Sequence, residues 1–156
     1  MSKKCRKGHT SMNYAGHLTG GLVAAGIVGA TSFVMSGLNI GIGAVCAVTT
    51  LVMALYPDFD IASTPSKYSY IIGIPAIILC MFFNKIQTAM LILAFIAVPK
   101  MFPHRGLVHT LRFGALATIC WIFIFNPYLH VNLMFTFIAG MIGYLTHLLL
   151  DSHVRL

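Results

Sequence analysis

The strongest constraint on this chain is a series of long apolar runs separated by short polar breaks. The first run covers residues 14–38 and the second covers residues 40–56, and neither contains a Lys, Arg, Asp or Glu. Runs of about 20 such residues have the length that crosses the hydrocarbon core of a bilayer as a helix. Because 58% of the 156 residues are hydrophobic and only 8% are charged, the sequence predicts an all-α integral membrane protein.

The remaining apolar runs complete a pattern of about six membrane segments. They cover residues 68–83, 86–98, 107–125 and 128–150. Turns are predicted near residues 36–39 and at Asn126-Pro127, and a polar loop is predicted at residues 63–67 from its Ser, Thr, Pro and Lys content. We therefore expect a basic cytoplasmic arm at residues 1–13 and a single membrane-embedded helical domain at residues 14–156.

The third and fourth runs are short for complete spans, and two interpretations of them compete. They could form one long helix with Lys85 near its middle, which would cost roughly 2.5–3.5 kcal/mol for a central lysine. They could instead form a helical hairpin with Lys85 at its tip, either re-entrant or in locally thinned bilayer. The hairpin is favoured, because it also keeps Asp58 and His104 on the same side of the membrane.

The basic residues indicate the orientation. With the amino terminus in the cytoplasm, nine of the ten Lys and Arg residues fall on the cytoplasmic side and only Lys85 falls outside, as the positive-inside rule requires. We therefore predict an inner-membrane protein with both termini cytoplasmic. The net charge of +7 does not indicate nucleic-acid binding, because the basic residues lie at the ends of apolar runs rather than in a patch.

All three acidic residues and four histidines fall at the cytoplasmic membrane boundary, whereas His9 and His153 lie in the terminal tails and His130 on the outer side. His147 and Asp151 are four residues apart, so on a continuous helix they share a face and can bind one cation. Asp58 and Asp60 are two apart beside a proline, and in an extended loop both side chains would point to one side. The candidate metal ligands are His17, Asp58, Asp60, His104, His109, His147 and Asp151.

Mixed imidazole and carboxylate ligands favour Zn, with Mn, Fe, Ni and Mg as alternatives. Seven candidates exceed the number that one catalytic zinc needs, so one or two ions per chain are expected. Each motif alone has a plainer explanation. A histidine at a helix end is often an interfacial polar residue, the Pro-Asp-x-Asp turn could only stop a helix, and His104-Arg105 could be an interfacial basic cluster.

Four sequence elements in order also carry a family resemblance. They are His17, then Pro57-Asp58-Phe59-Asp60, then residues 104–110 (HRGLVHT), then residues 143–151 (GYLTHLLLD). Together they resemble the YdjM-like family of bacterial LexA-regulated inner-membrane, metal-dependent hydrolases, over about residues 14–153. The resemblance implies a multi-helix membrane fold with a metal-dependent hydrolase activity. Val108 departs from the threonine often found at its position, and the threonine-proline-glycine segment common in the family does not follow Asp151.

The function expected from these parts is hydrolysis of a phosphoester in a lipid or lipid-linked substrate at the cytoplasmic membrane boundary, by a metal-activated water. Arg105 would clamp a phosphate or developing oxyanion, Thr110 would orient a ligand, and Asp60 is counted with these catalytic residues as well as with the ligands. The alternatives are a small metal-ion carrier or channel, and a non-enzymatic membrane factor stabilised by metal. A transport path would need polar residues along the helix centres, where this chain offers only Thr, Ser, Cys and Gly.

Overall fold

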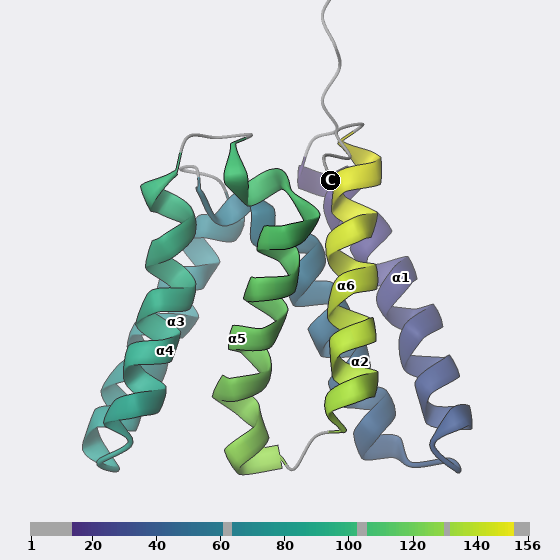
Figure 1. Cartoon of the computed structure of the whole chain (residues 1–156), viewed down its shortest axis with the longest axis horizontal. Coiled ribbons are helices and arrows are strands. Elements are labelled where there is room, and N and C mark those ends of the chain that lie inside the picture. The colour runs from purple at the N-terminus through teal and green to yellow at the C-terminus, as the bar shows by residue number, and fades with distance from the viewer. Residues whose placement is uncertain (1–13, 61–63, 103–105, 130–131, 152–156) are drawn as a thin grey trace, which may run out of the picture.

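The computed structural model describes residues 14–60, 64–102, 106–129 and 132–151, and within these ranges the chain is all-helical. The elements are α1 (Tyr14–Met35), α2 (Ile40–Leu55), η1 (Tyr56–Asp60), α3 (Thr64–Phe82), α4 (Ile86–Ala97), η2 (Val98–Met101), η3 (Leu107–His109), α5 (Leu111–Leu129) and α6 (Leu133–Leu150). Six long helices run alternately up and down, with the three short 3₁₀ helices at one end (Figure 1). The predicted all-α class is confirmed for the described residues.

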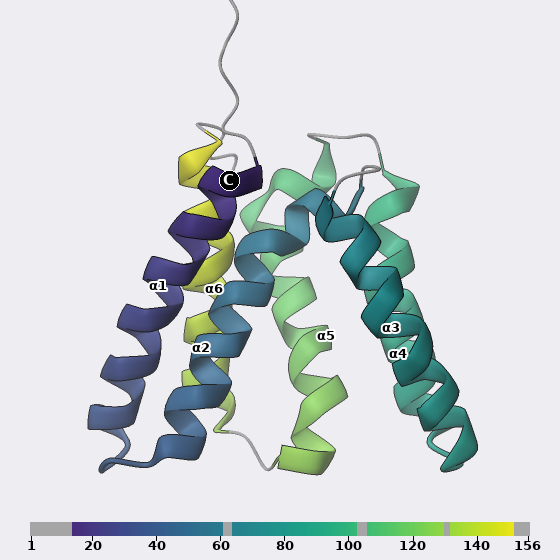
Figure 2. The same ribbon diagram turned by 180° about the vertical axis from the view of Figure 1, so that it is seen from behind.

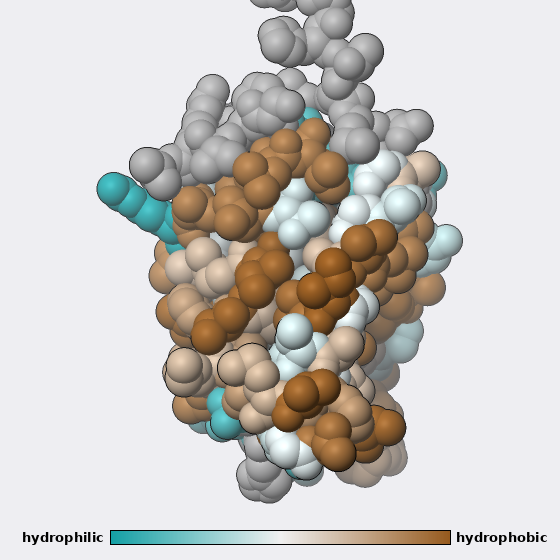
Figure 3. All heavy atoms as spheres, turned by 90° about the vertical axis from the view of Figure 1, so that its right-hand side faces the viewer, coloured by the Kyte–Doolittle hydropathy of each residue, from teal (hydrophilic) through white to brown (hydrophobic). Residues whose placement is uncertain are grey.

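Four of the helical segments are long and apolar enough to cross a membrane by length and composition. They are Ala15–Met35, Ile40–Phe59, Thr64–Phe82 and Leu133–Leu150, while Ile86–Met101 and Leu111–Asn126 are shorter apolar helices. Their outer surfaces carry large exposed hydrophobic side chains, such as Ile27, Ile71 and Leu116. Apolar side chains cover most of the face seen in Figure 3, on which α1 lies. A surface of this kind is suited to lipid rather than to water.

The third and fourth runs form the hairpin rather than one long helix. The chain reverses at Asn84, which has a φ of 55°, and Lys85 immediately precedes α4 at the end of the bundle opposite the 3₁₀ helices. The third segment is longer than predicted, because α3 begins at Thr64 inside the expected polar loop. Pro65 is compatible with this helix start, since the first-turn N–H groups of a helix have no intrahelical acceptor.

Two other boundaries differ from the prediction. The turn expected at Asn126-Pro127 is wrong, because α5 continues to Leu129. The last helix begins at Leu133, where the side chain of Asn132 accepts a hydrogen bond from the backbone N–H of Phe135. The turn between α1 and α2 lies where it was predicted, and Gly37 there has a φ of 73°.

The helices form two groups. Helices α1, α2 and α6 pack on one another, and the α3–α4 hairpin is joined to them through α5 and η1 (Figures 1 and 2). Close approach within the first group depends on small residues, since a Cβ on Gly43 would lie 3.0 Å from the carbonyl oxygen of Gly29. The main buried cluster, which includes Met53, Tyr56 and Tyr144, joins α2, η1, α4, α5 and α6.

Candidate metal centre

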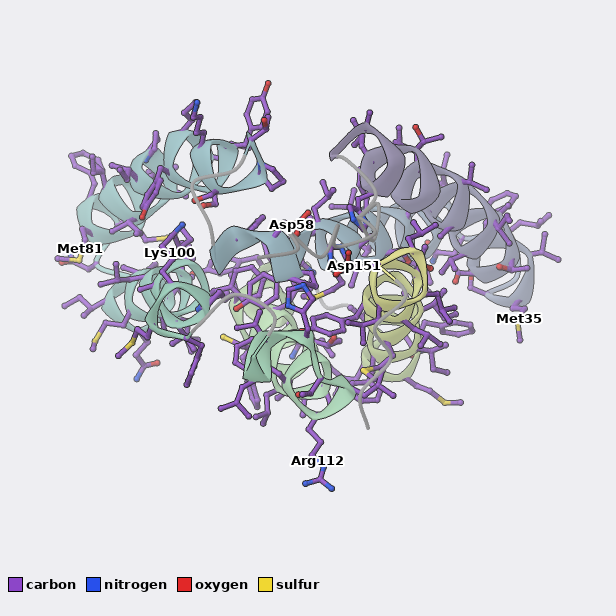
Figure 4. The ribbon with its side chains drawn as sticks, turned by 90° about the horizontal axis from the view of Figure 1, so that it is seen from above. Met35, Asp58, Met81, Lys100, Arg112 and Asp151 are labelled. Carbon is purple, nitrogen blue, oxygen red and sulfur yellow. The ribbon has the colours of Figure 1, made fainter. Side chains whose placement is uncertain are left out.

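Four segments distant in sequence meet at the end of the bundle that carries the 3₁₀ helices. The up-and-down topology brings the start of α1, the end of α2 with η1, η3 with the start of α5, and the end of α6 to this end (Figure 1). Seen from above in Figure 4, Asp58 and Asp151 lie inside the ring of helices, whereas Arg112 points outwards. Every described candidate ligand comes from one of these four segments.

Three of the predicted ligands form a compact group. One ligand atom from each of His17, Asp58 and His147 lies within 4.8 Å of the other two. The rings of His17 and His147 are stacked, with centroids 4.2 Å apart and 17° between the planes. Both histidines are buried, and the Asp58 carboxylate is partly exposed. An imidazole pair and a carboxylate therefore share a small space at the edge of the membrane-spanning region.

A hydrogen bond fixes the protonation of His147. Its Nδ1 lies 2.8 Å from the carbonyl oxygen of Ala54, and because a carbonyl can only accept, Nδ1 carries the hydrogen. In the neutral ring Nε2 then carries no hydrogen, and its lone pair is available to a metal ion. This Nε2 lies 3.7 Å from Oδ1 of Asp58. That distance is too long for a hydrogen bond. It is close to the separation of roughly 3.4 Å between two ligands of one tetrahedral ion with bonds of about 2.1 Å.

His17 adds a second buried nitrogen to the group. Its side chain is only 4% exposed, and its Nδ1 has no hydrogen-bond partner among the described residues. A buried polar atom without a partner usually costs about 1–3 kcal/mol. A cation bound between His17, His147 and Asp58 would remove this cost, so the group fits a divalent metal ion.

His109 and Asp151 form a second pair beside the first group. Nε2 of His109 lies 3.9 Å from Oδ2 of Asp151, and both side chains are buried. The ring of His109 meets that of His147 edge to face at 5.5 Å. These two contacts between a histidine and a carboxylate join different elements, His147 with Asp58 and His109 with Asp151. Two adjacent ligand groups are compatible with one or two ions.

Small residues position α6 for these contacts. Gly143 lies one turn before His147, and a Cβ there would be 2.1 Å from the carbonyl oxygen of Thr50. Thr50 in turn lies one turn before Ala54 on α2. The hydroxyl of Thr50 donates to the carbonyl oxygen of Ala139 at 3.0 Å. The two backbones are therefore close enough for His147 to reach the carbonyl of Ala54.

Of the other predicted site residues, the structure describes the side chain of Thr110 only. His104 and Arg105 lie outside the described residues, as does the side chain of Asp60. The extended loop expected around Asp58 is wrong, because this segment is the 3₁₀ helix η1, and a 3₁₀ helix has three residues per turn rather than an alternation of two. The Thr110 hydroxyl donates to the carbonyl of Leu107 at 2.7 Å and accepts from the N–H of Phe113 at 3.3 Å. Thr110 thus caps the start of α5, and its predicted role towards a ligand stays a prediction.

Sequence reasoning did not assign a role to Lys100 or Tyr144. The Lys100 ammonium donates to the carbonyl of Phe59 at 2.9 Å and to the hydroxyl of Ser66 at 2.5 Å, so it ties η1 to α3. The buried Tyr144 hydroxyl donates to the carbonyl of Val108, next to His109. The sequence signal for the contact between Tyr144 and Val108 was the presence of a tyrosine within the motif of residues 143–151. No comparable signal marks Lys100, which looked like an ordinary topology residue.

Comparison with known proteins gives one finding. Residues 12–155 match the family model described as YdjM inner membrane protein. No curated protein and no solved structure matches the chain. The match covers all of the described candidate ligands.

Proposed function

The chain belongs to the YdjM inner membrane protein family, and we propose that it acts there as a metal-dependent hydrolase of a phosphoester in a lipid or lipid-linked substrate. The observation that carries the proposal is the group formed by His17, Asp58 and His147, in which a lone-pair nitrogen faces a carboxylate oxygen at 3.7 Å. Two electron-rich atoms held this way in a buried site are a suitable pair of metal ligands.

The chain's own residues hold and orient such a ligand set. The carbonyl of Ala54 fixes the ring of His147 and keeps its hydrogen on Nδ1, a support that histidine ligands commonly have. The ring of His109 contacts that of His147 and lies near Asp151, so this pair extends the set. A divalent ion bound to these residues supplies Lewis acidity, which lowers the pKa of a bound water and stabilises charge on a phosphoryl oxygen.

The location of the site supports a lipid substrate. The ligands lie at the ends of membrane-length helices, where a phosphate head group of a bilayer lipid would be found. The excess of Lys and Arg at this end favours a cytoplasmic orientation for the site and for both termini. Arg105 and Asp60 remain the proposed residues for clamping the phosphate and assisting the reaction.

The test compares two variants at opposite ends of the bundle. The protein is purified in detergent without chelator, and metal content and phosphate release from lipid phosphates are measured for the wild type, His147→Gln and Thr88→Val. Thr88 contacts Tyr128 at the other end. We expect wild type and Thr88→Val to bind metal and hydrolyse substrate, and His147→Gln to lose both by at least 10-fold at equal folded yield. A wild type with no metal and no change in stability on adding Zn, Mn or Mg would refute the proposal.

A further inference from the structure

A large apolar cavity lies between the α3–α4 hairpin and the rest of the bundle. Its volume is about 280 Å³, and its walls come from α2, η1, α3, α4 and α5. Its lining includes Val52, Phe59, Ile72, Ala76, Phe95 and Trp121. Its size is close to the lower end of the range for ligand pockets, which are about 300–1,000 Å³. Almost no polar surface faces the cavity, so a polar or charged ligand would not be stable inside it.

The cavity begins beside the candidate metal centre. Phe59 lines it, and Phe59 follows the ligand Asp58 directly in η1. Along α3 the lining extends from Pro65 to Ala76, which is roughly 17 Å at 1.5 Å per residue. The cavity therefore runs from the level of the ligands towards the middle of the membrane-spanning helices.

A charged side chain, that of Lys100, lies near one end of this cavity. Its ammonium contacts the carbonyl of the lining residue Phe59 and the ring of Tyr70. Deeper in, Trp121 lines the cavity, and its indole N–H donates to the hydroxyl of Thr49 at 3.0 Å. A ligand that fits this arrangement has a charged head and a long apolar tail.

We propose that the cavity holds one hydrocarbon chain of the lipid substrate while the phosphoester head lies at the metal centre. This inference rests on the proposed function and adds where the apolar part of the lipid substrate binds. The surrounding solvent at this depth is itself hydrocarbon, so a chain enters from the bilayer without crossing water. Holding the tail positions the phosphorus next to the ligands, which is how contacts remote from the reacting atoms assist catalysis.

Trp121 lies where the cavity adjoins a second one. A second apolar cavity of about 210 Å³ lies between α2, α5 and α6, and Trp121 and Phe125 line both cavities. The hydrogen bond from Trp121 to Thr49 keeps the indole between them. The substrate chain therefore lies against Trp121 and stays within the first cavity.

Trp121 is also the only tryptophan of the chain, so its fluorescence reports on the cavity directly. The metal-loaded protein in detergent is titrated with an alkylphosphonate that carries bromine atoms on its long chain, because bromine quenches tryptophan on contact and the C–P bond is not hydrolysed. We compare the wild type with Ala76→Phe, which fills the cavity, and with Ala94→Phe. Ala94 is exposed on α4 and does not line the cavity.

We expect saturable quenching in the wild type and in Ala94→Phe, with at least 10-fold weaker binding in Ala76→Phe and unchanged metal content in all three. Equal quenching in the three proteins, or quenching that rises linearly without saturation, would overturn the inference. A dimer that Ala76→Phe dissociates would also overturn it, since a second copy would then occupy the cavity.

Failure of the cavity and failure of the proposed function give different results. Specific quenching without metal or hydrolysis would leave a lipid-binding cavity and refute the hydrolase. Hydrolysis of a short-chain phosphoester with no effect of Ala76→Phe on long-chain substrates would leave the hydrolase and refute the cavity.

Discussion

Gly143→Ala is the substitution most sharply constrained by the packing at the metal centre. A Cβ at this position would lie 2.1 Å from the carbonyl oxygen of Thr50, and contacts under 3.0 Å force a shift. Because the neighbour is backbone, the two helices must move apart by about 1 Å. The close-packed side chains around them resist this movement. Overpacking of this kind typically costs about 1–3 kcal/mol of folding stability.

The same separation acts on the metal ligands. Gly143 and His147 are one turn apart on α6, as Thr50 and Ala54 are on α2, so moving α6 away lengthens the 2.8 Å bond between His147 and the carbonyl of Ala54. Losing a contact that orients a metal ligand commonly lowers metal affinity by about 10–100-fold. We therefore expect Gly143→Ala to lower both thermal stability and metal affinity, although the substituted residue is not itself a ligand.

Gly26→Ala is the matched control, because a Cβ at Gly26 meets nothing within 4 Å. Replacing glycine by alanine in a helix without steric conflict usually stabilises by about 0.5–1 kcal/mol. Unfolding in detergent and elemental analysis are measured on both variants. If Gly143→Ala binds metal and unfolds as Gly26→Ala does, the proposed coupling between helix spacing and the ligand His147 is incorrect.

Three further predictions follow from other contacts. Chelation should lower the unfolding temperature, and added Zn or Mn should restore it, because the ion binds only the folded state; an unchanged transition would contradict the metal centre. Lys100→Met should destabilise the protein by about 1.5–3 kcal/mol, because it loses the charged hydrogen bonds to Phe59 and Ser66. Lys67→Met, at an exposed position, is the control and should change little, and thermal unfolding is measured for both variants. In a cysteine-free background, Lys85→Cys and Leu107→Cys should react with membrane-impermeant reagents from opposite faces, and labelling of both from the same face would refute the orientation.

The coarse fold was predictable because hydropathy and charge act locally. A run of about 20 apolar residues has few stable alternatives to a helix in a membrane, and Lys85 between two short runs has a natural place at a hairpin tip. The errors lie where polar residues join helices. Thr64 to Lys67 resemble a loop in composition, yet Pro65 fits a helix start and the hydroxyl of Ser69 donates back to the carbonyl of Ser66.

The sequence predicted which end of the bundle carries the candidate ligands, but not which of them meet across different elements. Spacing along the sequence suggested that His147 and Asp151 act together, since residues four apart share a helix face. The structure adds contacts between elements, His147 with Asp58 and His109 with Asp151, which spacing along the sequence cannot predict. These pairs depend on how α6 is set against α2 and η3. That register is determined by backbone contacts such as Gly143 with Thr50, which no side-chain pattern encodes.

Helix α6 links the two ligand groups through neighbouring residues that face different partners. Gly143 allows α6 to approach α2, which places His147 beside Asp58. The next residue, Tyr144, is fully buried and donates its hydroxyl hydrogen to the carbonyl of Val108, and its ring occupies the space left by Gly114, where a Cβ would lie 2.5 Å away. This contact holds η3 against α6, so that His109 lies beside His147 and Asp151. A change at Tyr144 should therefore disturb the pair formed by His109 and Asp151 first, whereas a change at Gly143 should first disturb the group that contains Asp58.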